Sequence, residues 1–193
     1  EEMRMLSRCL MVSHISGNNY FEANAMLSIA DIIVGGDSAV YSRVGFLKDL
    51  FSVREGDASG LPLMMAEWSL DKARDYGNMY TMSRAYVTMS HYYFFHGNSE
   101  KALECLGEAL HFVNEHHKRY YAFDNLNDSL SVYEAEADSI STEMRWIGDE
   151  KIKTVPAWIA DIREMLSITY SSMGMKRESD YNRNIYLDIL DAT

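Results

Sequence analysis

Proline is scarce in this chain, with 2 residues among 193, and runs of β-branched residues are few. Because proline interrupts helices and β-branched residues lower helix propensity, their scarcity favours helix. No stretch of eighteen apolar residues occurs, which excludes a membrane-spanning helix within these residues. Hydrophobic residues still make up 47% of the chain, enough to bury a substantial core. These features predict an all-α protein without a direct membrane span.

Cysteine is scarce as well, with only Cys9 and Cys105. Two cysteines are too few for a disulfide scaffold or a structural zinc site. Both lie among apolar neighbours in stretches with helical periodicity, so we expect two buried free thiols. They do not identify the cellular compartment.

Basic residues are outnumbered, with 18 Lys and Arg against 29 Asp and Glu and a net charge of −11. This balance argues against a nucleic-acid partner and weakly against an anionic membrane surface. The main interpretation is a soluble surface, and an acidic binding face is the alternative.

Sequence motifs of catalytic and metal sites are missing from the chain. There is no phosphate-binding glycine loop after a strand, no nucleophile elbow and no His-Glu-x-x-His motif. The six histidines do not supply three or four converging zinc ligands. Carboxylates such as Glu136 and Glu143 are assigned to a solvated helix face. We therefore expect no enzymatic activity, no metal and no cofactor.

Clusters of Gly and Asn divide the chain into about nine predicted helices. Ser99 is the expected N-terminal cap of the sixth. The predicted ranges are about 2–15, 20–34, 38–53, 61–76, 80–95, 99–117, 120–147, 156–173 and 176–190.

A small-residue pattern, Ala-x3-Leu-x2-Ala, occurs three times, beginning at Ala23, Ala66 and Ala102. Small residues at this spacing allow a neighbouring helix to approach closely. Recurrence of such a packing signature indicates an array of helical repeats rather than one compact core.

The best copy contains Tyr86, Met89-Ser90 and Tyr93 on one helix, then Gly97 and the alanine pattern on the next. It resembles the tetratricopeptide repeat, although Asn114 replaces the terminal proline. The resemblance implies a right-handed superhelical array of antiparallel helix pairs in a single domain spanning 1–193. Regular repeats would cover about 2–117, followed by a long helix over about 120–147 and a C-terminal pair over about 156–190.

In tetratricopeptide arrays, the inner wall is formed by positions of the first helix of each pair. The resemblance implies that this wall binds a peptide, a protein partner or a small ligand. Carried over by register, the groove residues are Arg84, Val87, His91, Phe94 and Phe95, with Ser42, Phe46, Asp49 and Leu50 before them and Tyr121, Asn125 and Asp128 after them. The alternative is that Phe46, Phe94 and Phe95 belong to the core.

A heptad stripe runs along the predicted helix over 120–147. In the favoured interpretation it packs on the neighbouring repeat. The alternative is that it pairs with a second copy of the chain. The anchors of this homodimer would be Phe123, Leu130, Tyr133 and Ile140.

The segment 179–190 resembles the end of the repeat-containing input region of certain bacterial sensor histidine kinases. The resemblance implies a non-catalytic binding domain of a membrane-bound kinase, placed on the extracytoplasmic (periplasmic) side, with a cytoplasmic location as the alternative. Any kinase core would follow Thr193. The chain starts at Glu1 without an initiator Met, which we interpret as a fragment of a longer protein. The competing hypotheses are a freestanding scaffold that binds a partner peptide and, ranked last, an unrelated α-helical enzyme.

Overall fold

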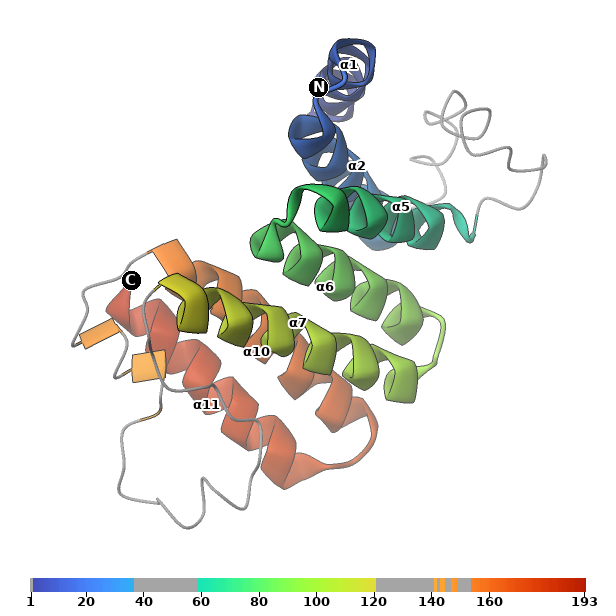
Figure 1. Ribbon diagram of the computed structural model, residues 1–193. Helices are drawn as coiled ribbons and strands as arrows, with labels where there is room; N and C mark the ends of the chain where they lie inside the picture. Colours follow the sequence, from blue (N-terminus) through green and yellow to red (C-terminus); the bar gives the residue numbers. More distant parts are fainter. Residues whose placement is uncertain (1, 37–58, 121–140, 142, 145–146, 149–153) are drawn as a thin grey trace.

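The computed structural model describes residues 2–36, 59–120, 141, 143–144, 147–148 and 154–193. Over these residues it contains seven α-helices and no strand, which confirms the all-α prediction (Figure 1). The helices are α1 (Glu2–Ser16), α2 (Asn19–Gly35), α5 (Leu61–Tyr76), α6 (Met79–Phe95), α7 (Ser99–Tyr120), α10 (Thr154–Ser172) and α11 (Lys176–Ala192).

Each of these helices lies within about three residues of a predicted range. The other two predicted helices lie mostly outside the described residues. None of 38–53 is described, and most of 120–147 is not described either. Ser141 is described and is not helical, and its hydroxyl oxygen accepts the N–H of Met144 at 3.3 Å. The predicted helix over 120–147 is therefore not continuous across Ser141.

Three of the turns between helices use the same Gly-Asn dipeptide. Gly17, Gly77 and Gly97 have φ of 67°, 69° and 75°, a left-handed conformation that costs glycine little and ends the preceding helix. The asparagine that follows then caps the next helix. Asn98 Oδ1, for example, accepts the N–H of Lys101 at 3.1 Å. The prediction that Ser99 caps this helix is therefore wrong by one residue.

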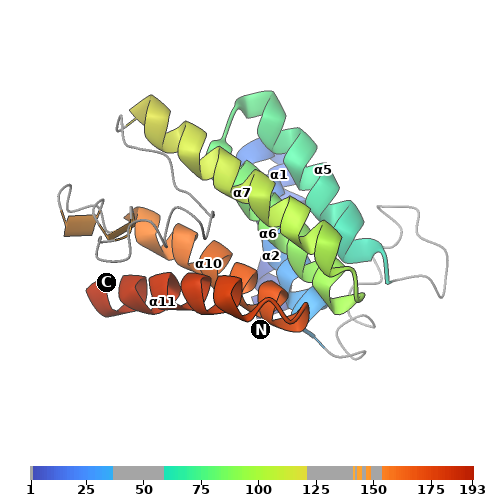
Figure 2. The ribbon, with the colours of Figure 1, turned by 90° about the horizontal axis from the view of Figure 1, so that it is seen from below.

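Helix α6 lies at the centre of the packing (Figures 1 and 2). It contacts α5 and α7, its neighbours in sequence, and also α2 and α10, which are distant in sequence. Helix α10 also packs on α7 and pairs with α11. The inner sides of α2, α6 and α10 are thereby brought next to one another.

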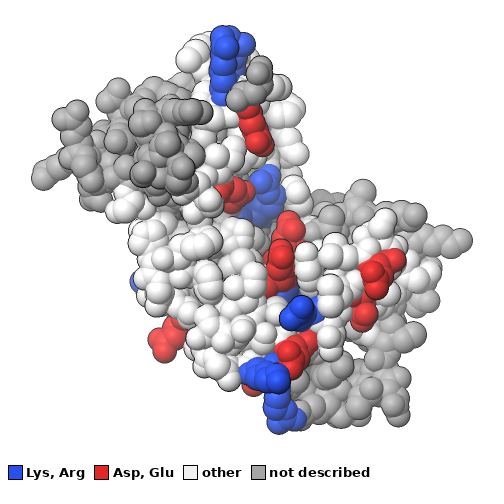
Figure 3. Space-filling model, turned by 180° about the vertical axis from the view of Figure 1, so that it is seen from behind, with Lys and Arg blue, Asp and Glu red and all other residues white. Residues whose placement is uncertain are grey.

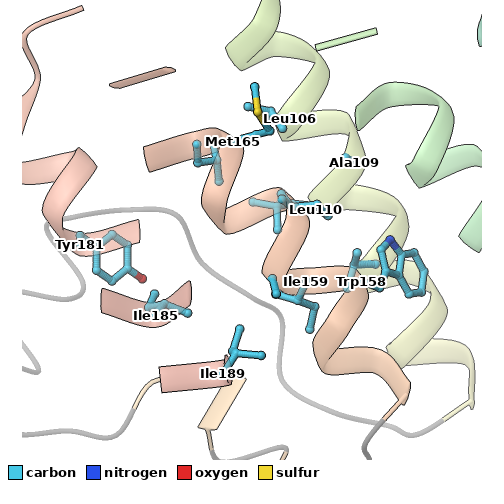
Figure 4. Close-up of a cluster of buried hydrophobic side chains, with 13 residues drawn as sticks. Leu106, Ala109, Leu110, Trp158, Ile159, Met165, Tyr181, Ile185 and Ile189 are labelled. Carbon is cyan, nitrogen blue, oxygen red and sulfur yellow. The ribbon is translucent and has the colours of Figure 1, made fainter. Parts of the chain in front are cut away.

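The alanine signature is buried in all three copies. Its nine residues lie on α2, α5 and α7, and none is more than 6% exposed. This burial explains why the pattern recurs, because a larger side chain at these positions would separate the helices. Figure 4 shows the largest core cluster, where α7 supplies Leu106, α10 supplies Ile159 and α11 supplies Ile185.

A buried ion pair joins α10 to the short segment that precedes it. The Nε and Nη2 atoms of Arg163 lie 2.8 and 2.6 Å from Glu143 Oε1, and Nη1 donates to Asn182 Oδ1 on α11 at 2.8 Å. The Arg163 side chain also lies over the ring of Tyr181. Arg163 has no exposed surface and Glu143 is 2% exposed. The assignment of Glu143 to a solvated face is therefore wrong, because its charge is matched by an arginine that the sequence pattern did not identify.

The cysteines differ from each other in their surroundings. Cys9 is exposed, which contradicts the expectation of two buried thiols, because only one side of α1 packs against α2. Cys105 is half-buried. Burial first, then the charges of Glu104 and Glu108, raise the pKa of its thiol to about 11.

No helix in the described part of the chain is both long enough and apolar enough to span a membrane.

Candidate functional site

A pocket of about 140 Å³ opens where α2, α6 and α10 meet. Its lining residues come from three helices that are distant in sequence. They are Asp31 on α2, Arg84, Val87, Thr88 and His91 on α6, and Trp158, Asp161 and Glu164 on α10. The α6 residues follow one another at helical spacings of three and four, so one face of α6 forms the centre of the pocket.

The structure brings three of the predicted groove residues, Arg84, Val87 and His91, into this pocket. Phe94 instead packs against the core cluster of α7, α10 and α11, as the alternative interpretation expected. Phe95 lies outside the pocket and is 64% exposed, so it is neither a pocket residue nor a core residue.

The remaining predicted site residues lie outside the described residues. They are the groove candidates Ser42, Phe46, Asp49, Leu50, Tyr121, Asn125 and Asp128 and the dimer candidates Phe123, Leu130, Tyr133 and Ile140.

Asp31 connects α2 to α6 at one end of the pocket. Arg84 Nη2 lies 3.4 Å from Asp31 Oδ2, and the Thr88 hydroxyl donates to Asp31 Oδ1 at 2.7 Å. Arg84 also donates to Asn24 Oδ1 at 3.4 Å. The charge of Asp31 is thus balanced by an arginine within the pocket.

Two further carboxylates, Asp161 and Glu164, also line the pocket, three residues apart on α10. Neither forms an ion pair with another residue of the described ranges. Burial raises the pKa of Asp161, and the like charges of Glu164 and Asp31 raise it further, while Arg84 opposes them. Glu164 in turn raises the pKa of Tyr186 on α11 by its charge. Seen from behind the view of Figure 1, acidic side chains lie along the middle of the molecule with basic side chains beside them (Figure 3).

His91 lies between these groups on α6. Burial lowers the pKa of its imidazole, and the charges of Asp31 and Glu164 oppose that shift without reversing it. The ring is therefore neutral at pH 7, and the pocket carries more negative than positive charge.

Trp158 forms the wall of the pocket on α10. Its indole N–H donates to Ser83 Oγ at 2.8 Å, and the Ser83 hydroxyl donates to the carbonyl of Ala109 at 3.0 Å. Its ring meets the rings of Tyr80 and His116 edge to face. These contacts hold α10 against both α6 and α7.

Sequence reasoning missed the other five lining residues, which are Asp31, Thr88, Trp158, Asp161 and Glu164. The tetratricopeptide register assigned Asp31 to a second helix, away from the inner wall, yet the structure packs α2 against both α5 and α6. The three α10 residues share the spacing Trp-x2-Asp-x2-Glu, which places them on one side of a helix. That spacing was the available signal.

A larger hollow of about 540 Å³ lies between α10 and α11 and shares Glu164 with the pocket. Its other residues include the hydroxyl groups of Ser167, Ser171 and Ser179 together with Arg183. The two hollows are thus adjacent on the surface.

The fold and site define an all-α protein of packed helical hairpins, with an acidic pocket between three of its helices. Residues 76–193 match the family described as "Domain of unknown function (DUF5113)", and the chain belongs to this family. The matched region includes every residue that lines the pocket except Asp31. No curated protein and no solved structure matches the chain.

His91 should make folding stability depend on pH. Its pKa is lower in the folded state than in the unfolded state, so the unfolded chain binds more protons as pH falls below about 6.5. When the pH is lowered from 7.5 to 5.5, we expect the free energy of unfolding to fall less in His91→Gln than in the wild type. Urea unfolding followed by circular dichroism measures it. The charged groups that face His91 are Asp31 on α2, Arg84 on α6, and Asp161 and Glu164 on α10.

The control for this comparison is His111→Gln on the exposed side of α7. The raised pKa of Asp161 changes the folding stability in the opposite direction, because in that case the folded state binds the extra proton. This effect occurs only at pH values nearer to the ordinary pKa of Asp, 3.8. A stability difference between wild type and His91→Gln that stays constant from pH 7.5 to 5.5 would contradict the prediction.

Proposed function

We propose that this chain is a non-catalytic binding domain, a tetratricopeptide-like array whose inner helix side receives a segment of a partner protein. The observation that carries the proposal is the pocket at the junction of α2, α6 and α10. It combines an apolar wall of Val87 and Trp158 with charged groups that fix orientation, a composition typical of recognition sites. The buried alanine signature supports the repeat architecture, which we propose to be a right-handed superhelix in one domain.

We further propose that the domain is the input region of a membrane-bound sensor histidine kinase, on its extracytoplasmic side. The support is the resemblance of residues 179–190 to the end of such regions. An occupant of the pocket would touch α10, which is paired with α11. A shift of α10 would then be passed to α11 and the chain that follows it.

Selection of random peptides displayed on phage tests the binding function. Peptides are selected on the wild-type domain, and each is then measured by fluorescence anisotropy against Val87→Trp and His91→Trp, which fill the pocket. We expect selected peptides to lose at least about tenfold in affinity for both variants, a loss of about 1.4 kcal/mol.

Glu108→Trp, on the exposed side of α7, is the matched control and should bind as the wild type does. Circular dichroism confirms that each variant is folded. Selected peptides that bind the two pocket variants as tightly as the wild type, or a selection that enriches none, would contradict the proposal.

The gene sequence after Thr193 separates the sensor from a freestanding scaffold. A membrane-spanning helix followed by a kinase core supports the sensor. A stop codon directly after Thr193 rules it out and favours the scaffold that docks a peptide.

A further inference from the structure

The pocket between α2, α6 and α10 is lined by three carboxylates and by one arginine, Arg84. The charge of Asp31 is balanced by Arg84, and its carboxylate accepts a hydrogen bond from the Thr88 hydroxyl. Asp161 and Glu164 form no ion pair with another described residue. The charge of Glu164 raises the pKa of Asp161, and the charge of Arg84 lowers it by less. The other basic side chain that lines this pocket, His91, is kept neutral by burial. A bound cation at this point would relieve the repulsion between the two carboxylates.

The size of the pocket limits what that cation can be. Its volume of about 140 Å³ is below the range of about 300–1,000 Å³ typical of sites for whole small molecules. It is therefore closer in scale to one side chain than to a free ligand. The larger hollow of about 540 Å³ next to it has room for the chain segment that bears this side chain.

The layout of polar and apolar groups matches a basic side chain. Val87 and Trp158 supply apolar surface, and Asp161 and Glu164 supply carboxylates to the same pocket. Lysine and arginine have an apolar stem and a charged end, and they bury the stem along apolar surfaces while the end stays at a polar or wet edge. Serine hydroxyls of the adjoining hollow can hydrogen-bond to the peptide groups that flank the side chain.

We infer that this pocket binds a single Lys or Arg side chain of a partner protein, with the flanking segment in the hollow between α10 and α11. Asp161 and Glu164 pair with its charged end, and Val87 and Trp158 contact its stem. The inference rests on the proposed binding function and adds the chemistry of the residue that is recognised.

Titration of the isotope-labelled domain, followed by nuclear magnetic resonance, tests this inference. The probes are the peptide Ac-Ala-Ala-Lys-Ala-Ala-NH2, its analogues with arginine, norleucine or glutamate at the centre, and free n-butylamine. We expect the lysine and arginine peptides to shift the Trp158 indole N–H resonance in a saturable way. The norleucine peptide should bind at least about tenfold more weakly, because norleucine lacks the charged end. Butylamine should also bind at least about tenfold more weakly, because it lacks the flanking peptide.

The double variant Asp161→Asn, Glu164→Gln should bind the lysine peptide roughly tenfold more weakly. Its matched control is Asp188→Asn, Asp191→Asn on α11, which removes the same charge at the same spacing from exposed positions. Equal binding by the double variant and the wild type would overturn the inference. Binding of the norleucine peptide as tight as that of the lysine peptide would also overturn it. Binding of butylamine as tight as that of the lysine peptide would overturn it too and would identify a site for small amines instead.

Failure of the inference and failure of the proposed function give different results. Phage-selected peptides that depend on Val87 but have no basic residue that contacts the pocket would overturn the inference and leave the binding function intact. An absence of pocket-dependent peptides in both experiments would overturn both.

Discussion

Replacing Arg163 with alanine should lower the free energy of unfolding by roughly 3–5 kcal/mol, the cost observed when one partner of a buried ion pair is removed. Arg163 has no exposed surface, and its guanidinium holds the buried Glu143 at 2.6 and 2.8 Å and Asn182 at 2.8 Å. Without it, the carboxylate of Glu143 is buried with no cation, and the side-chain oxygen of Asn182 loses a donor. Urea unfolding followed by circular dichroism measures the change.

Two further variants separate this effect from a general response to losing an arginine. Arg74→Ala removes an exposed pair, since Arg74 and Asp71 are 3.1 Å apart but 52% and 76% exposed, and it should cost less than about 1 kcal/mol. The double variant Arg163→Ala, Glu143→Ala should be more stable than the sum of the two single effects predicts, because no orphaned charge remains. Additive losses, or a loss below 1 kcal/mol in Arg163→Ala, would show that the pair is not a buried unit.

Replacing Trp158 with alanine should cost about 3–5 kcal/mol, the range for truncating a buried aromatic residue. The substitution removes the ring that packs against Tyr80 and His116, and it leaves Ser83 without the donor at 2.8 Å. Because Trp158 is a principal contact of α10 with α6 and α7, the damage should be local. Hydrogen exchange should show lost protection in α10 and α11 and nearly unchanged protection in α1 and α2, which do not contact them substantially.

Trp158→Phe serves as the control for this change. It retains an aromatic ring in the pocket wall and loses the N–H donor, so it should cost about 1 kcal/mol for the missing hydrogen bond, plus a smaller packing loss. Equal loss of protection in all seven helices of Trp158→Ala would contradict the idea that the contacts of α10 are local, and would indicate one cooperative unit.

The two residues act on different sides of α10. Arg163 ties the helix to α11 and to Glu143, and Trp158 ties it to α6 and α7. Asp161 and Glu164 lie on the same helix and line the pocket. A partner that paired with these carboxylates would therefore contact the helix that connects the pocket to the C-terminal hairpin.

Helix positions could be predicted well because their signals are local. Gly at a left-handed position followed by a capping Asn ends one helix and starts the next, and both effects need only a few neighbouring residues. The alanine signature also predicted burial correctly, since Ala30, Ala73 and Ala109 have no exposed surface. The capping residue of α7 was predicted one position late, within the usual uncertainty of a helix end.

The candidate site could be predicted only in part. The register correctly placed Arg84, Val87 and His91 on one side of α6, because helical spacing determines which side chains share a face. It assigned Phe94 and Phe95 to the same wall, but Phe94 packs into the core and Phe95 projects away from it. Helical spacing alone does not say which neighbouring helix covers a given face.

The sequence by itself determined the all-α class, the approximate ends of the described helices and the small residues at their contacts, because these depend on propensity, turn chemistry and periodicity over a few residues. The tertiary structure alone decided that Asp31, His91 and Asp161 share a pocket and that Glu143 is buried against Arg163. Some of these residues are more than a hundred positions apart in the sequence. These pairings follow from how α2 and α10 pack on α6, which no local pattern in the chain specifies.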